Sequence, residues 1–104
     1  MEADQARPTD GARVVMEIGG AIGAAVVHTP GAMEGDEIEA WPADATGPLT
    51  HALVRRRHVG QRCRFAAVFP ALEAGDYTLR SVGDREAAPR KVTVLGGQVA
   101  AADW

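Results

Sequence analysis

The side chains with the most evident chemistry are arginines, which cluster in one short stretch of the chain. Residues 51–64 contain no acid and hold five arginines: Arg55, Arg56, Arg57, Arg62 and Arg64. The stretch before it, residues 32–47, contains no base and holds five acids: Glu34, Asp36, Glu37, Glu39 and Asp44. Two like charges about 5 Å apart repel by about 0.8 kcal/mol in water, and salt weakens this repulsion without removing it. The arginine cluster therefore predicts an anionic group opposite it.

Three hypotheses remain for the environment of these arginines. They are solvated or paired with the chain's own acidic stretch, they contact a protein, or they bind nucleic acid or a small anion. Nucleic acid is disfavoured because no aromatic residues are interleaved with the arginines and the net charge is −3. We expect a protein partner, either a second copy or another chain, on a face made of Arg55, Arg57, Arg62, Arg64 and Trp104. Tryptophan is enriched at contact surfaces, and the alternative is that Trp104 packs against the edge of the core.

A metal site is the second hypothesis, and the candidate ligands are His51, His58 and Cys63. Imidazole and thiolate are the ligands that zinc and copper prefer. The alternative is that Cys63 is a small buried hydrophobic residue and that the histidines lie at strand ends. The sequence thus allows a metal- or anion-binding accessory protein, the anion then being held by the arginines. We expect no cofactor.

Catalytic motifs are missing from the sequence. The only serine is Ser81, in Leu-Arg-Ser-Val-Gly-Asp, which lacks the glycine spacing of a nucleophile elbow. The glycines of residues 19–24 have the wrong spacing for a dinucleotide loop, and Pro30 follows too soon for the helix that such a loop requires. We therefore predict that the protein is not an enzyme.

The elements that must position these side chains are predicted to be strands. A chain of 104 residues supports one domain, and turn signals recur every 8–14 residues, which is typical of a sandwich or barrel. We expect a flexible tail over residues 1–11 and an all-β, single antiparallel β-sandwich of about seven to eight strands over residues 12–104. The β-prone runs are Arg13–Ile18, Ile22–His28, Glu37–Trp41, His51–His58, Arg62–Phe69, Asp76–Ser81, Arg90–Leu95 and Gln98–Ala102.

Two hairpins are predicted in more detail. A turn at Gly60-Gln61 places His58 opposite Cys63, Val54 opposite Ala67 and Ala52 opposite Phe69, with Arg56 nominally inward. It also places four arginines on the outer face: Arg55, Arg57, Arg62 and Arg64. A second turn, at residues 96 and 97, pairs the last two strands and predicts a buried face of Val92, Val94, Val99 and Ala101.

The corner before the late strands carries a resemblance. Leu72, Gly75 and Tyr77 form a Leu-x-x-Gly-x-Tyr spacing, in which a tyrosine hydroxyl bonds back to backbone upstream. With the segment Val92–Val99, it resembles the transthyretin-like sandwiches, which include the carboxypeptidase regulatory domain and the collagen-adhesin B-type repeats. A fibronectin-III or other Ig-like topology is the alternative.

The resemblance implies a non-catalytic module that stabilises or attaches its neighbours. The adhesin isopeptide pair is not recognisable, because Lys91 is the only lysine and the chain has no asparagine. The sequence is also similar to short stand-alone bacterial proteins of unknown function, some labelled phospholipases, a label that its residues do not support.

Cysteine usage and hydropathy bear on the compartment. Cys63 is the only cysteine, so no intramolecular disulfide forms. The first ten residues lack the basic and apolar regions of a secretory signal, and the apolar stretch Val14–Val27 is interrupted by Glu17 and three glycines. We expect a cytoplasmic protein that does not enter a membrane.

Overall fold

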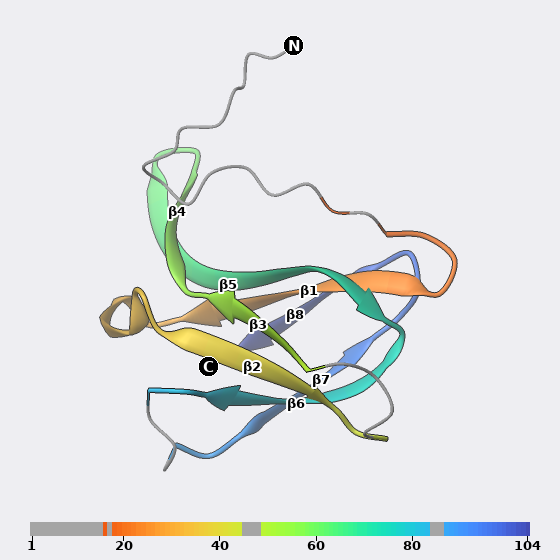
Figure 1. Cartoon of the computed structure of the whole chain (residues 1–104). Helices are drawn as coiled ribbons and strands as arrows, with labels where there is room; N and C mark the ends of the chain where they lie inside the picture. Colours follow the sequence, from red (N-terminus) through yellow and green to blue (C-terminus); the bar gives the residue numbers. More distant parts are fainter. Residues whose placement is uncertain (1–15, 17, 45–48, 84–86) are drawn as a thin grey trace.

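The chain forms two sheets of four strands that pack face to face (Figure 1). The computed structural model describes residue 16 and residues 18–44, 49–83 and 87–104; the predicted tail, residues 1–11, lies outside them. The first sheet contains, in spatial order, β4 (Arg55–Val59), β5 (Arg62–Glu73), β1 (Ile22–Thr29) and β8 (Val99–Asp103). The second contains β3 (Thr50–Leu53), β2 (Glu37–Pro42), β6 (Gly75–Ser81) and β7 (Arg90–Val94). The prediction of an all-β sandwich is confirmed.

All strand pairs are antiparallel except one, because β1 and β8 run parallel. The predicted hairpin of the last two strands is therefore wrong: β7 pairs with β6 in the second sheet, and β8 crosses to the first. Val94 is buried as predicted, opposite Gly75, but Val99 is 47% exposed. In the parallel register Ala100 and Ala102, rather than Val99 and Ala101, pack against the core. Because β8 crosses to the first sheet, its pairing with β1, and not the turn before it, decides which face of β8 is buried.

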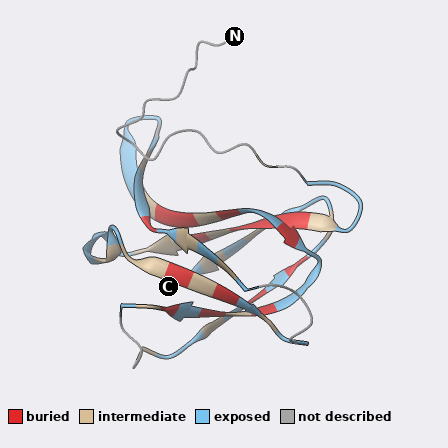
Figure 2. Ribbon diagram, viewed as in Figure 1, coloured by how far each residue is buried: buried red, intermediate tan, exposed pale blue. Residues whose placement is uncertain are grey.

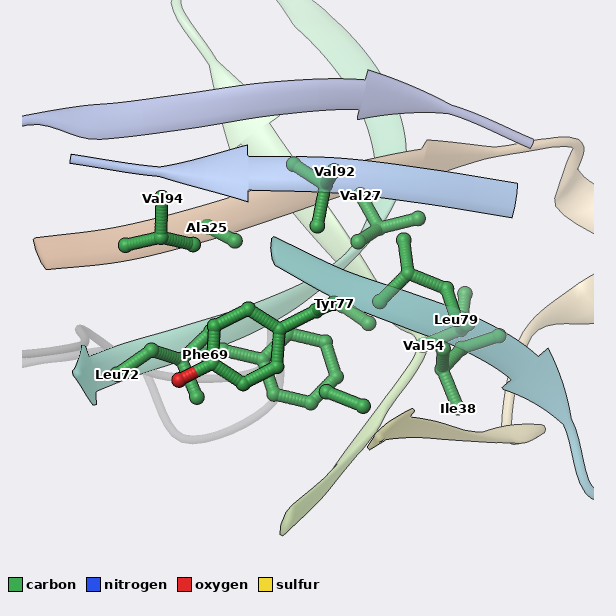
Figure 3. Packing of buried hydrophobic residues seen from close by; sticks show 12 residues of the cluster. Ala25, Val27, Ile38, Val54, Phe69, Leu72, Tyr77, Leu79, Val92 and Val94 are labelled. Atoms are coloured by element: carbon green, nitrogen blue, oxygen red, sulfur yellow. The ribbon is translucent and has the colours of Figure 1, made fainter. Parts of the chain in front are cut away.

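The core lies between the two sheets and is built from alternate residues of the strands. Figure 2 shows buried positions along strands of both layers. Figure 3 shows residues of this cluster, which come from both sheets. The fully buried side chains of greatest volume are Phe69, Ile38, Leu79, Val27, Val54 and Val94.

Strand β5 contains a bulge that brings two non-alternating residues into the core. Its partner β1 pairs Ala25 with Phe69 but Gly23 with Leu72, so β5 holds one extra residue there. Pro70, which cannot donate to a ladder, lies within this irregularity. Phe69 and Leu72 therefore both reach the core cluster, although simple alternation would place them on opposite faces.

The predicted strand over residues 51–58 is divided between the sheets. Thr50–Leu53 pairs with β2, Arg55–Val59 pairs with β5, and Val54 between them is 1% exposed. The Val54 N–H donates to the Asp36 carbonyl, and its own carbonyl accepts from Gly35. The predictions that Ala52 faces Phe69 and that Val54 faces Ala67 in one ladder are wrong. The chain changes sheet at Val54, which is buried in the core, so the residues before it do not pair with β5.

The corner between β5 and β6 agrees with the sequence prediction. The Tyr77 hydroxyl donates to the Glu73 carbonyl oxygen over 2.6 Å. Leu72 and Tyr77 are buried in the core cluster, and Gly75 begins β6 with a φ of +151°. The three corner residues thus fix how the chain passes from the first sheet to the second. This hydrogen bond fits the resemblance without establishing a family.

Candidate protein-interaction face

Strands β4 and β5 form the hairpin that carries the arginine cluster. The two-residue turn at Gly60 and Gln61 begins with a φ of +64° at Gly60, which suits glycine. The predicted register is confirmed, with His58 opposite Cys63 and with Arg57 opposite Arg64. Figure 1 shows this hairpin rising beyond the two packed layers, and Figure 2 shows it almost wholly exposed.

The hairpin places four arginines on one face, which we call the arginine face: Arg55, Arg57, Arg62 and Arg64. In β5, Phe65 and Ala67 pack toward the core, so the intervening positions point away from the second sheet. Pairing carries this alternation to β4, where Arg57 and Arg55 lie opposite Arg64 and Ala66. The fold therefore places the four arginines on one face, as the sequence predicts.

Arg57 is the partly buried member of the arginine face. Its Nε donates to the Ala66 carbonyl oxygen over 3.3 Å. Burial lowers the pKa of Arg57 below the usual value, and the neighbouring charge of Arg55 lowers it further. Both effects disfavour the charged form of the guanidinium.

The acids of residues 32–44 lie elsewhere. Glu37 and Glu39 alternate with buried Ile38 along β2, so they point away from the first sheet. The Glu37 carboxylate contacts the Nδ1 atom of His51 in β3, and Glu39 accepts from the Trp41 indole N–H over 3.1 Å. Glu37 and Glu39 are therefore engaged on the second sheet.

Arg56 of the hairpin contacts the acidic stretch. Arg56 lies opposite Phe65, on the face that the sequence predicts as inward, yet its side chain is 51% exposed and lies 3.8 Å from Glu34. Arg56 points away from the arginine face, so this contact does not involve that face. Within the described part of the chain, no ion pair involves Arg55, Arg62 or Arg64.

The three candidate metal ligands do not converge. His58 and Cys63 are cross-strand neighbours, but His51 belongs to β3 in the other sheet. Among the residues that the structure describes, no group of three or more His, Cys, Asp or Glu side chains has the geometry to hold a metal ion. Cys63 is exposed, so its interpretation as a small buried hydrophobic residue is wrong.

Trp104 lies on the core side of the first sheet, apart from the arginine face. It packs against the core cluster, its backbone N–H donates to the His28 carbonyl over 2.7 Å, and the Arg90 guanidinium lies 5.0 Å from its ring centroid. The structure therefore places Trp104 where the alternative interpretation expects it, at the edge of the core. Nothing in the sequence indicates that Arg90 covers it.

A pocket of about 390 Å³ adjoins the arginine face at the end of β1. The sequence gives no sign of it, because His28 and Thr29 meet residues more than 30 positions away only through the pairing of β1 with β5. The Nδ1 atom of His28 is buried and has no hydrogen-bond partner among the described residues. The pocket is lined by His28, Thr29, Arg62, Cys63, Arg64 and Phe65.

Comparison with protein-family models, with curated proteins and with solved structures finds no significant match to this chain. In the described part of the chain, no helix is long and apolar enough to span a membrane.

Proposed function

We propose that this domain is a non-catalytic protein-interaction module whose arginine face binds an acidic surface of a partner protein. The observation that carries the proposal is the placement of four arginines on one side of a projecting hairpin. Like charges directly opposite each other on paired strands are destabilising. An acidic partner offsets this repulsion, whereas solvation alone leaves it in place.

The charge balance supports a protein partner and allows a second copy of the chain. The hairpin holds five of the 11 basic residues and none of the 14 acidic ones, which leaves six bases against 14 acids, a net −8, on the rest of the chain. Nucleic acid is the less favoured ligand, because stacking aromatics are absent from the arginine face. The free thiol of Cys63 fits our proposal of a reducing cytoplasm.

A binding measurement distinguishes these ligands. We expect fluorescein-labelled poly-glutamate to bind the wild type and to lose binding to a variant carrying Arg55→Gln, Arg57→Gln, Arg62→Gln and Arg64→Gln. The matched control carries Arg80→Gln and Lys91→Gln, two exposed bases of the second sheet, and we expect it to bind like the wild type. Equal binding by all three proteins, or tighter binding of single-stranded DNA than of poly-glutamate, would count against the proposal.

Metal binding is the second candidate function, favoured by the direct pairing of exposed His58 with exposed Cys63. Two ligands on adjacent strands can share one ion, and a second copy of the chain can complete its coordination. The expected signs are a zinc-dependent rise in Tm and zinc-dependent dimerisation, both lost in His58→Ala. A Tm and mass unchanged by zinc would remove this candidate.

A further inference from the structure

The first sheet has a gap beside the arginine hairpin. Strand β1 ends at Thr29, opposite Phe65, while β5 begins three residues earlier, at Arg62. Pro30, with φ −63° and ψ 156°, directs the chain into the short 3-10 turn η2 (Gly31–Met33). Residues 62–64 therefore have β4 on one side and, among the described strands, no neighbour on the other.

Backbone hydrogen-bonding groups point into this gap. A two-residue turn places its flanking pair, Val59 and Arg62, in a hydrogen-bonded position, and such pairs alternate along an antiparallel ladder. Cys63, opposite His58, is consequently a non-hydrogen-bonded position toward β4. Its N–H and C=O point toward the side that β1 does not reach, where the pocket of about 390 Å³ lies.

The gap is also charged. Arg62 and Arg64 are exposed, lie two residues apart on the same face, and line the pocket together with partly exposed His28. Residues two apart on a strand are separated by about 7 Å. A strand with carboxylates at every second position repeats with the same spacing, so it can oppose both arginines while its backbone pairs with Cys63.

We infer that this gap receives an extended acidic segment of the partner protein, which adds a strand to β5 where β1 has ended. The inference deepens the proposed function, on which it rests, by naming the form of the acidic partner. Main-chain hydrogen bonds to an exposed sheet edge supply affinity in this mode of recognition, and side-chain contacts supply specificity. A small anion would use Arg62 and Arg64 but leave the backbone groups of Cys63 unpaired.

The test uses fluorescein-labelled Val-Glu-Val-Glu-Val-Glu and two relatives, one with lysine in place of glutamate and one N-methylated at every backbone nitrogen. We expect the acidic peptide to bind the full chain and the lysine peptide not to bind. N-methylation of the peptide should weaken binding by roughly tenfold or more, because the backbone donors are lost. The protein variant Arg62→Gln/Arg64→Gln should weaken binding of the unmethylated acidic peptide by a similar factor. Arg80→Gln is the matched control and should bind as the wild type does.

Cys63 supplies a second readout, since it is the only cysteine and lines the gap. We expect the acidic peptide to slow alkylation of Cys63 by N-ethylmaleimide, and inorganic phosphate at equal charge concentration not to do so. Cys63→Pro removes the gap-facing N–H but no donor of the β4 ladder, so a folded Cys63→Pro variant should bind the acidic peptide less tightly than Cys63→Ser.

The outcomes separate this inference from the proposed function. If the N-methylated peptide binds as tightly as its parent, strand addition is overturned, while a loss of binding in the arginine variants still supports an acidic partner. If phosphate protects Cys63 as well as the peptide does, the site takes a small anion and the inference fails. If Val-Glu-Val-Glu-Val-Glu does not bind, the inference also fails. The proposed function is then judged separately, by whether poly-glutamate binds the wild type and not the quadruple arginine variant.

Discussion

Arg57 and Arg64 lie directly opposite each other in the ladder between β4 and β5. Their side chains share a face, and the pKa of Arg57 is lowered by burial and, in addition, by the nearby charge of Arg55. A domain without a use for this arrangement would be expected to place opposite charges at such a pair, because these stabilise a sheet. Under the proposed function, this pair would link the stability of the domain to the binding of its partner.

The first prediction follows from this pair. Arg64→Gln removes a like charge opposite Arg57 and should raise the free energy of unfolding by about 0.2–1 kcal/mol at low salt. The gain should shrink as salt is added, because exposed charges are screened. Urea unfolding at two salt concentrations measures both effects. A variant that is less stable than the wild type at low salt would mean that Arg64 has a stabilising partner, contrary to this account.

The second prediction concerns the corner between the sheets. Tyr77→Phe removes the hydroxyl that donates to the Glu73 carbonyl and should lower the free energy of unfolding by about 0.5–1.5 kcal/mol. The ring remains in the core, so the denaturant dependence of unfolding should not change. Urea unfolding followed by tryptophan fluorescence checks this. An unchanged midpoint would show that water replaces the bond without loss.

The third prediction is a titration. Burial raises the pKa of Tyr77, and the charges of Glu73 and Asp44 raise it further. Tyr77 is the only tyrosine, so phenolate absorbance reports it alone. We expect it to titrate at higher pH in the native protein than in urea, where the value is about 10.

The sign of the linked stability change follows from the raised pKa. The folded state favours the neutral phenol, so this stabilisation is complete below the unfolded pKa and is lost as pH rises through the folded one. Wild-type stability should therefore fall at high pH more steeply than that of Tyr77→Phe. Parallel stability profiles for the two proteins would contradict the raised pKa.

The fourth prediction concerns the crossing from β7 to β8. A Cβ on Gly96 would lie 1.9 Å from the Gly20 carbonyl oxygen, which is backbone and cannot move aside cheaply. Gly96→Ala should lower the free energy of unfolding by about 1–3 kcal/mol or more. Gly83→Ala is the matched control, since its Cβ would meet only the Asp36 side chain at an ordinary 3.7 Å. Equal Tm values for the two variants would mean that the chain crosses elsewhere.

Features of local origin are predictable from this sequence. Short runs between glycines and prolines indicate strands, the turn at Gly60 fixes the register of His58 against Cys63, and the corner spacing places the Tyr77 hydroxyl on upstream backbone. These depend on neighbours within a few residues. The four arginines fall on one face for the same reason, since alternation and one short turn determine it.

Features that depend on contacts distant in sequence are not predictable in this way. The β8 strand follows a turn that suits a hairpin, yet it pairs with β1 in the other sheet, so Val99 is exposed. The gap beside Cys63 exists because β1 ends at Thr29, and only the pairing of β1 with β5 reveals it. Likewise, the pattern of apolar and basic residues over residues 51–58 does not show that the chain passes from one sheet to the other at Val54.

The most direct test of the central claim is affinity capture from native lysate with the full chain. The quadruple variant Arg55→Gln, Arg57→Gln, Arg62→Gln, Arg64→Gln is compared with the wild type and with Arg80→Gln/Lys91→Gln, all three matched in Tm. We predict that the wild type and the control variant retain the same acidic protein and that the quadruple variant loses it. Identical captures by all three, or capture of a partner without an acidic segment, would contradict a role for the arginine face in binding.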